Sequence, residues 1–197
     1  MLDLRTEEEL MTAAVGGDEE AFRLLALRLR EVIGRFLRHL GCDRATVEDL
    51  TQETLLRLWT GKDRYQQRAK LRTFVLTIAK NLWLNHCRRK PMVSYDAPAG
   101  GRSELDKLLI QDGLPPGPEA ALIDKYRAYR VRQAILGLPE RQRIVFVLAH
   151  LEGLRHAEIA QMLGIAEGTV KSRMHRAIRG LRELLEADSA GLEGKEE

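Results

Sequence analysis

The sequence predicts an all-α protein of two small helical domains joined by a flexible linker. In residues 18–90 and 119–186 the apolar side chains recur with a helical period, without a convincing run of alternating strand residues. Residues 91–118 hold five of the six prolines and four glycines, which disfavour a continuous helix or a central strand. We therefore predict domains at 1–90 and 119–186, a linker at 91–118 and an acidic tail at 187–197.

Start and stop signals place the helices of each domain. Thr6 and Glu9 have the spacing of a capping box, so a first helix is expected there. An amphipathic segment follows at 18–41, where Gly41 can end the helix. We expect further helices at 46–60, 71–89, 120–136 and 140–151, with Pro139 in a first helical position, and a helix-turn-helix at 158–177.

Composition limits the compartment and the chemistry of the chain. Charged residues make up 31% and hydrophobic ones 44%, and no apolar run approaches the roughly 18 residues of a membrane span. The first ten residues lack the pattern of a secretory signal, so a cytoplasmic location without membrane insertion is expected. Cys42 and Cys87 are too few and too far apart for a disulfide framework or a CxxC metal site. We expect reduced thiols and no metal or cofactor.

The net charge of +3 is unevenly distributed. Residues 1–90 hold 17 basic and 13 acidic side chains, and residues 119–186 hold 12 and 8. The linker has 2 basic and 4 acidic side chains, and the tail has 1 and 4. A polyanion would therefore meet two separate basic lobes.

The segment 158–177, EIAQMLGIAEGTVKSRMHRA, has the pattern of a DNA-reading helix-turn-helix. Gly164 tolerates the positive φ of the turn, and an apolar stripe on the second helix should face inward: Val170, Met174, Ala177 and Leu181. Its other side presents Thr169, Lys171, Ser172, Arg173 and Arg176, with no acid between positions 168 and 182. Such side chains contact base edges and phosphates in a major groove, so DNA binding is favoured over a merely solvated basic face.

Residues 64–90 predict a second nucleic-acid surface. They contain eight Lys or Arg and no acid, with aromatic side chains interleaved. Cations bind phosphates, and rings offer stacking surfaces to unpaired bases. Phe74, Ile78 and Leu82 share a helical stripe, so we expect Phe74 to be buried.

Residues 46–60 form a helix with two distinct faces. Val47, Leu50, Thr54, Leu55 and Leu58 are expected to pack inward. Asp49, Gln52, Glu53 and Leu56 recur at helical spacing on another face, with Trp59 beside them. That face is either a solvated surface with a partly buried Trp or a docking face for another protein, and composition alone favours the former.

The order of these motifs resembles the bacterial sigma factors of the sigma-70 class, specifically the compact extracytoplasmic-function group. The resemblance covers residues 18–90, the counterpart of region 2, and 119–186, the counterpart of region 4. EDLTQETLLRLW resembles the segment that binds the clamp helices of RNA polymerase, and LRTFVLTIAKNLWLNHCRRK the segment that reads and opens the minus-10 element. The segment from Leu138 to Ala177 resembles the region that reads the minus-35 element.

The resemblance implies roles for particular residues and partners. It implies polymerase docking by Asp49, Gln52, Glu53, Leu56 and Trp59; minus-10 contacts by Lys70, Lys80, Asn81, Asn85, Arg88 and Arg89; and minus-35 contacts by Arg155, Thr169, Lys171, Ser172, Arg173 and Arg176. The implied partners are core RNA polymerase, through its clamp helices and flap, promoter DNA and an anti-sigma factor. Catalysis would belong to the polymerase, so the chain itself is not expected to be an enzyme.

Two alternatives use the same helix-turn-helix. A stand-alone transcriptional regulator of the response-regulator type would need a receiver or ligand-binding lobe, and residues 1–90 show no alternating strands for one. An enzyme acting on nucleic acid would need a nucleophile or clustered carboxylates, and the acids here lie on predicted helix surfaces.

Overall fold

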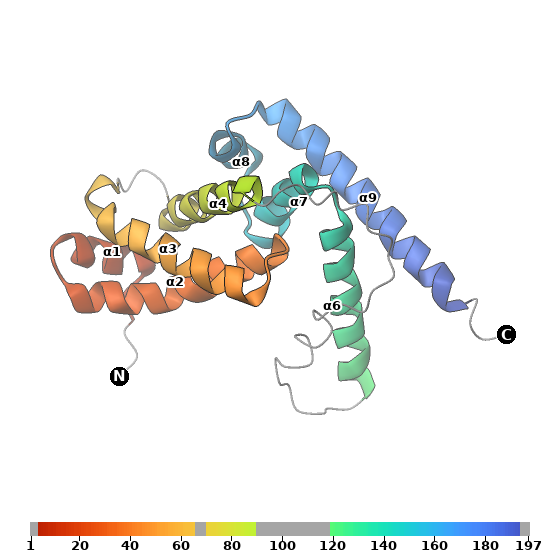
Figure 1. The fold of residues 1–197 in the computed structure, drawn as a ribbon, viewed down its shortest axis with the longest axis horizontal. Helices are drawn as coiled ribbons and strands as arrows, with labels where there is room; N and C mark the ends of the chain where they lie inside the picture. The colour runs from red at the N-terminus through yellow and green to blue at the C-terminus, as the bar shows by residue number, and fades with distance from the viewer. Residues whose placement is uncertain (1–3, 66–69, 90–118, 194–197) are drawn as a thin grey trace.

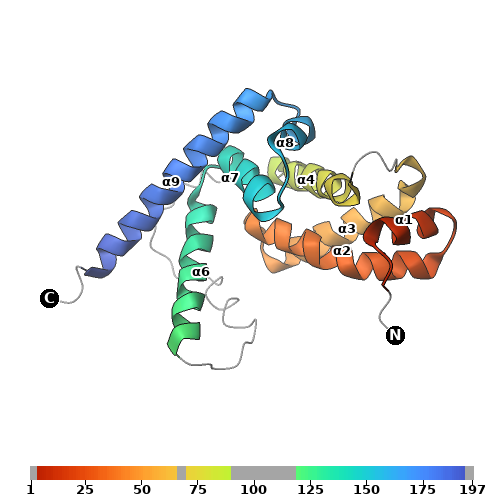
Figure 2. The same ribbon diagram turned by 180° about the vertical axis from the view of Figure 1, so that it is seen from behind.

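The computed structural model describes residues 4–65, 70–89 and 119–193. All regular elements in this part of the chain are helical, which confirms the all-α prediction. Figures 1 and 2 show the helices gathered into an N-terminal lobe, α1 to α4, and a C-terminal lobe, α6 to α9. The predicted linker at 91–118 lies outside the described residues. None of the helices described is long and apolar enough to cross a membrane.

The N-terminal lobe is built on the long amphipathic helix α2. It comprises α1 (Glu7–Val15), α2 (Glu19–His39), α3 (Arg44–Thr60) and α4 (Leu71–Arg89), with a 3-10 turn at Lys62–Arg64. Helix α2 contacts each of the other three helices. The centre of its buried stripe consists of Leu25, Leu29, Ile33 and Phe36, which are fully buried. Their burial at helical spacing removes apolar surface from water and fixes which side of α2 faces inward.

Local capping explains where these helices begin. The Thr6 amide donates to Glu9 at 2.6 Å and the Glu9 amide donates to the Thr6 hydroxyl at 3.2 Å, so the predicted capping box is confirmed. Helix α3 begins at Arg44, earlier than expected, because the Asp43 carboxylate accepts a hydrogen bond from the Thr46 amide at 2.8 Å.

The C-terminal lobe consists of α6 (Glu119–Gly137), α7 (Glu140–Phe146), a π-helical turn at Val147–Leu151, α8 (His156–Leu163) and α9 (Glu167–Glu193). Pro139 precedes α7 with an extended ψ of 138° and does not occupy its first turn. The helix expected at 140–151 is α-helical only to Phe146 and continues as the π-helical turn from Val147. Helix α9 continues through residues 187–193, which the sequence assigned to the acidic tail.

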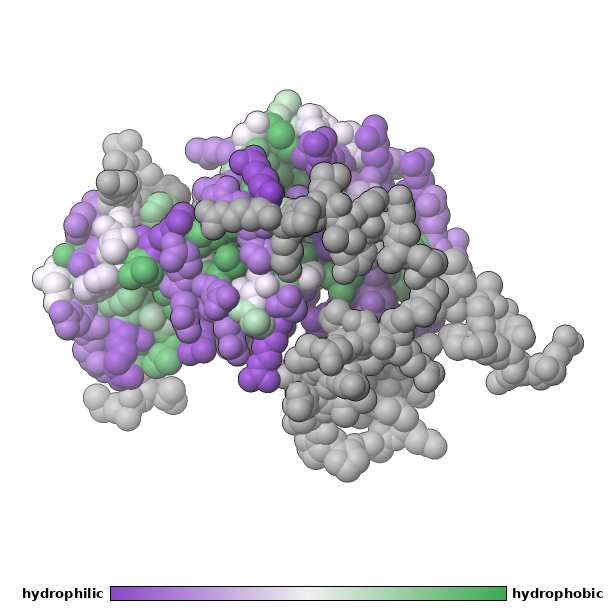
Figure 3. All heavy atoms as spheres, in the orientation of Figure 1, coloured by the Kyte–Doolittle hydropathy of each residue, from purple (hydrophilic) through white to green (hydrophobic). Residues whose placement is uncertain are grey.

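The two lobes are packed against each other. Figures 1 and 2 both place α4 beside α7 and α8, and α2 contacts α6. Most of the buried apolar residues of both lobes belong to one continuous cluster. Hydrophilic side chains cover much of the coloured surface of the face shown in Figure 3, with apolar patches between them.

The sequence predicted that Phe74 is buried, but it is only partly buried and packs against the outside of the core. Its ring lies against that of Tyr65, with centroids 5.6 Å apart. Of the three residues on the helical stripe that predicted its burial, Leu82 is buried, whereas Phe74 and Ile78 are partly exposed. Phe74 therefore contributes to an aromatic pair at the edge of the N-terminal lobe.

His39 gives the fold a measurable pH dependence. Burial, reinforced by the positive charges of Arg132, Arg35 and Arg38, lowers the pKa of His39 from 6.5 to about 4. The unfolded chain therefore binds a proton more readily than the folded chain between these values. The stability that neutral His39 contributes is present above about pH 6.5 and is lost as the pH falls toward 4.

We expect wild type to lose about 1–2 kcal/mol more unfolding free energy than His39→Gln between about pH 7 and pH 5, since solvent screens part of the shift. Urea unfolding of both chains at the two pH values measures the difference. Parallel losses in the two chains would contradict this assignment.

Candidate nucleic-acid and protein interfaces

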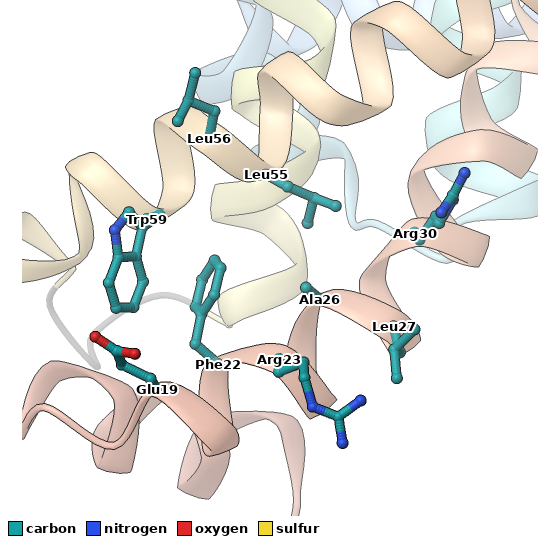
Figure 4. Close-up of a pocket in the computed structure, with 9 residues that line it drawn as sticks. All are labelled: Glu19, Phe22, Arg23, Ala26, Leu27, Arg30, Leu55, Leu56 and Trp59. Atoms are coloured by element: carbon teal, nitrogen blue, oxygen red, sulfur yellow. The ribbon is translucent and has the colours of Figure 1, made fainter.

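An apolar groove lies between α2 and α3 in the N-terminal lobe (Figure 4). Its volume is about 570 Å³. Leu27 and Leu56 stand on its two sides and are 58% and 56% exposed. The full lining is Glu19, Phe22, Arg23, Ala26, Leu27, Arg30, Leu55, Leu56 and Trp59. Large apolar side chains that are this exposed and are surrounded by charged side chains are typical of a protein interaction site.

Trp59 is held in position at one end of the groove. Its ring lies 4.7 Å from that of Phe22, centroid to centroid, and the Lys62 ammonium sits 3.6 Å from the Trp59 ring centroid. A cation over an indole face is attracted by the ring quadrupole, so Lys62 restricts the rotation of the indole. An aromatic side chain ordered before binding loses less entropy when a partner covers it.

The predicted docking residues lie on α3 as the sequence expected, but they do not all line the groove. Asp49 and Gln52 are exposed on the strip that leads to Leu56. The Glu53 carboxylate accepts a hydrogen bond from the Arg57 guanidinium at 2.7 Å within the same helix. Of the predicted docking residues, Leu56 and Trp59 therefore line the groove together. Asp49, Gln52 and Glu53 lie on α3 outside the groove lining.

Sequence reasoning missed the α2 wall of the groove. Phe22, Ala26 and Leu27 were assigned only to an amphipathic helix. A usable signal was present, because Leu27 falls outside the stripe formed by Leu25, Leu29 and the other buried residues of α2. A leucine beyond the buried stripe marks apolar surface that this lobe does not cover.

Helix α4 presents one exposed polar face. Asn81, Asn85 and Arg88 are spaced at i, i+4 and i+7 and are all exposed, so they share this face. Lys70, just before the helix, is exposed as well. The side chain of Arg89 lies outside the described part of the structure. The face therefore carries amides and cations with free access from solvent.

Lys80 lies apart from that face. It is 7% exposed, and its ammonium donates to the Met162 carbonyl of α8 at 2.9 Å. Burial lowers the pKa of this lysine. One residue along a helix turns the side chain by about 100°, so Lys80 and Asn81 point in different directions. With the lobes packed in this way, Lys80 does not face solvent or any DNA.

The C-terminal lobe contains a helix-turn-helix formed by α8 and α9. Gly164 ends α8 with a φ of +64°, a conformation that glycine adopts without strain. The inward stripe of α9 is confirmed, since Val170, Met174, Ala177 and Leu181 are buried. Its packing directs the opposite side of α9 toward solvent.

The outward face of α9 carries most of the predicted DNA contacts. Thr169, Ser172, Arg173 and Arg176 follow one another at i, i+3, i+4 and i+7, and they are exposed or partly exposed. Lys171 falls on the flank of this face and pairs with Glu167 at 3.3 Å. Arg155 caps α8 from an exposed position, where its amide donates to the Glu158 carboxylate at 2.7 Å.

Comparison with known families agrees with this division of the chain. The model of sigma-70 region 2 matches residues 25–91, which include the groove residues of α3 and all of α4. The model of sigma-70 region 4 matches residues 128–181, which include the helix-turn-helix.

Curated relatives decide the assignment. The extracytoplasmic-function sigma factor SigW of Bacillus subtilis is 31% identical over 172 residues, which cover 86% of this chain and 91% of the relative. SigF of Caulobacter vibrioides, from the same group, is 30% identical over 188 residues, covering 93% and 96%. The chain belongs to the extracytoplasmic-function sigma factors. The predicted resemblance is therefore confirmed, and this family is a class neither of response regulators nor of enzymes.

Solved structures agree on the fold of this sigma factor. CnrH, in complex with the cytosolic domain of CnrY, superposes with a TM-score of 0.63 at 23% identity over 91% of this chain and 96% of CnrH. The sigma factor RpoE of Bartonella quintana, in complex with the anti-sigma factor NepR, gives 0.61 at 24% identity over 85% and 98%. At these identities the likeness supports the fold alone.

Proposed function

We propose that this sigma factor binds core RNA polymerase through the α2/α3 groove and directs promoter-specific initiation through α4 and α9. Helix α4 would read the minus-10 element and α9 the minus-35 element. The observation that carries the proposal is the exposed apolar groove at Leu27, Leu56 and Trp59, in the lobe matched by sigma-70 region 2. A transcription factor that binds DNA alone has no need of such a groove.

The groove suits an amphipathic helix of the polymerase. A partner helix would place apolar side chains between Leu27 and Leu56 and cover the face of Trp59. Arg23 and Arg30 on the rim are exposed and could pair with acids on that helix. The clamp helices of the polymerase are our candidate for this partner, and the flap would contact the C-terminal lobe.

Two DNA contacts of moderate affinity give strong overall binding when polymerase holds both lobes of the chain. In the N-terminal lobe, Asn81 and Asn85 carry amides that can both donate to and accept from base edges, and Arg88 can bind phosphate. In the C-terminal lobe, Arg173 and Arg176 can reach guanine or phosphate in a major groove. Tethering raises the effective concentration of the second contact once the first has formed.

The chain would contribute binding and DNA opening, and the polymerase would contribute the chemistry of RNA synthesis. Opening the minus-10 element requires unstacking of a base, which costs a few kcal/mol that protein contacts must offset. The ring of Phe74, on α4, lies against that of Tyr65 at the edge of the lobe, where an unpaired base could stack. Such a role places this sigma factor in the cytoplasm with the polymerase.

An anti-sigma factor is the remaining partner that we propose. RpoE of Bartonella quintana was solved with the anti-sigma factor NepR. A protein that covers the groove would compete directly with polymerase, because the groove is a single apolar surface.

The proposal is tested by adding purified chain to core polymerase and a library of promoter templates. We expect the chain to co-elute with core and to give run-off transcripts from a subset of templates. The absence of both co-elution and transcript across the library would overturn the proposed function.

Asp49 and Gln52, the exposed polar residues of α3 near Leu56, give a prediction of smaller effect. Asp49→Arg or Gln52→Arg is expected to weaken binding to core about tenfold, because each places a new charge at the approach to the groove. Both positions are exposed, so the helical circular dichroism signal should not change. Unaltered affinity in a core-binding titration would remove the strip from the interface.

A further inference from the structure

The groove between α2 and α3 carries opposite charges at its two ends. Glu19 lies beside Trp59 at one end, which we call the Trp59 end, and Arg30 lies at the other, the Arg30 end (Figure 4). Both charged residues belong to α2, and at about 1.5 Å per residue they are roughly 16 Å apart along its axis. Between them α2 contributes apolar side chains to the lining, among them Phe22 and Leu27. The groove therefore differs in charge along its length.

Glu19 and Arg30 are the charged residues of the lining whose charges are unmatched. Both are exposed, and their side chains form no hydrogen bond or ion pair within the described part of the chain. The lining contains one further charged residue, Arg23, which donates to both carboxylate oxygens of Glu20, at 2.6 and 2.7 Å. A bidentate pair leaves less net charge for another molecule to recognise. Glu19 and Arg30 therefore dominate the electrostatics of the groove.

The α3 wall adds no charge to the groove. It consists of Leu55, Leu56 and Trp59. Lys62, which follows α3, does not line the groove, and its ammonium lies 3.6 Å from the centroid of the Trp59 ring. A cation held against an indole by the ring quadrupole is already engaged. Because both unmatched charges are on α2, the charge difference runs along the groove and not across it.

An amphipathic helix with a charge at each end fits this arrangement. Such a helix lays an apolar stripe into a hydrophobic groove, and roughly 16 Å corresponds to about three helical turns. A basic side chain near Glu19 and an acidic one near Arg30 would match the charges of the groove. In the reverse direction the same helix meets a like charge at each end, which disfavours binding.

We propose that the groove selects the direction of its partner: it binds an amphipathic helix of about three turns whose basic residue lies at the Trp59 end and whose acidic residue lies at the Arg30 end. A reversed partner would turn the N-terminal lobe end for end, so this selection fixes where α4 lies relative to the partner. The identity of the partner as a clamp helix of polymerase rests on the proposed function, whereas the charge requirement rests on Glu19 and Arg30.

Quenching of a bimane fluorophore by Trp59 tests the direction in the full chain. The probe is a hydrocarbon-stapled helical peptide of about twelve residues with a stripe of leucines, a lysine at one end and a glutamate at the other. We expect bimane at the lysine end to be quenched on binding and bimane at the glutamate end to stay bright. Trp83, the other tryptophan, is only 4% exposed, and Trp59→Phe should remove the quenching.

A second peptide separates charge from the helix dipole. It carries the lysine and the glutamate at exchanged ends of its sequence, and we again expect quenching at the lysine end. Quenching that follows the sequence direction of the peptides, equal quenching at both ends, or no binding of either peptide to the wild-type chain would overturn the proposal.

Exchanging the two charges of the groove is expected to exchange the quenched ends. In the double variant Glu19→Lys with Arg30→Glu, bimane at the glutamate end should be quenched and bimane at the lysine end should stay bright. The double variant Glu19→Gln with Arg30→Gln removes both charges without placing a cation at the start of α2, and it should quench both ends alike. A preference for the lysine end that persists in both double variants would overturn the role of these residues.

Core polymerase tests whether docking uses the same direction. The exchange of Glu19 and Arg30 leaves the net charge unchanged, and we expect it to weaken binding to core about tenfold. The matched control is Arg44→Glu with Glu48→Arg, which exchanges an exposed i,i+4 pair on α3 outside the groove lining and should bind core like wild type.

The two assays distinguish the two proposals. If core binds the wild-type chain and both exchange variants equally, the charge requirement is overturned at the polymerase, although the proposed function stands. A chain that orients the peptides as expected but does not bind core overturns the proposed function and supports the selection of direction by the groove.

Discussion

Leu56→Asp is expected to weaken binding to core RNA polymerase about 100-fold, the loss typical of a central interface residue. Leu56 is 56% exposed and forms part of the groove wall opposite α2, so the change places a charge where a partner helix would have to desolvate it. The same exposure means that little packing within the chain is lost. Titration of labelled chain with core polymerase measures the effect.

Leu4→Asp is the matched control for this change. Leu4 is 94% exposed and does not line the groove, so the same substitution there should leave affinity for core unaltered. Equal affinities of the two variants, with unchanged circular dichroism, would contradict the assignment of the groove as the docking site.

Arg176→Ala is expected to reduce transcription about tenfold from promoters that depend on the minus-35 element. Arg176 is exposed on the same face of α9 as Thr169 and Arg173, and truncation removes a cation that can contact a base or a phosphate. Run-off transcription from templates with and without the minus-35 element measures the effect.

Arg182→Ala makes the same change of charge further along α9, beyond the residues predicted to contact DNA, and Arg182 is likewise exposed. We expect near-normal transcription from this variant. If Arg176→Ala and Arg182→Ala reduce transcription equally, or if neither does, Arg176 is not a minus-35 reader.

Features governed by neighbours along the chain were predictable from the sequence. The capping box of Thr6 and Glu9, the bounds of α4 and the turn at Gly164 each follow from a few adjacent residues. The inward stripe of α9 follows from helical spacing alone. The start of α3 was misplaced because the capping role of Asp43 was not recognised.

Features that depend on contacts between distant segments were not predictable in the same way. Leu27 lines the groove only because α2 and α3 lie together, and Lys80 is buried only because α8 meets α4. Spacing placed Lys80 on the same helix as Asn81 but gave no information about which lobe would cover it. The match to region 2 identifies the segment, and the packing decides which of its side chains are accessible.

The central claim is that both lobes read promoter DNA while polymerase holds them, and selection of bound sequences from random DNA by the reconstituted holoenzyme tests it most directly. The account predicts enrichment of two separate motifs at a fixed spacing, with only the upstream motif weakened by Arg176→Ala. Enrichment of a single motif, or of none beyond that selected by core polymerase alone, would contradict it.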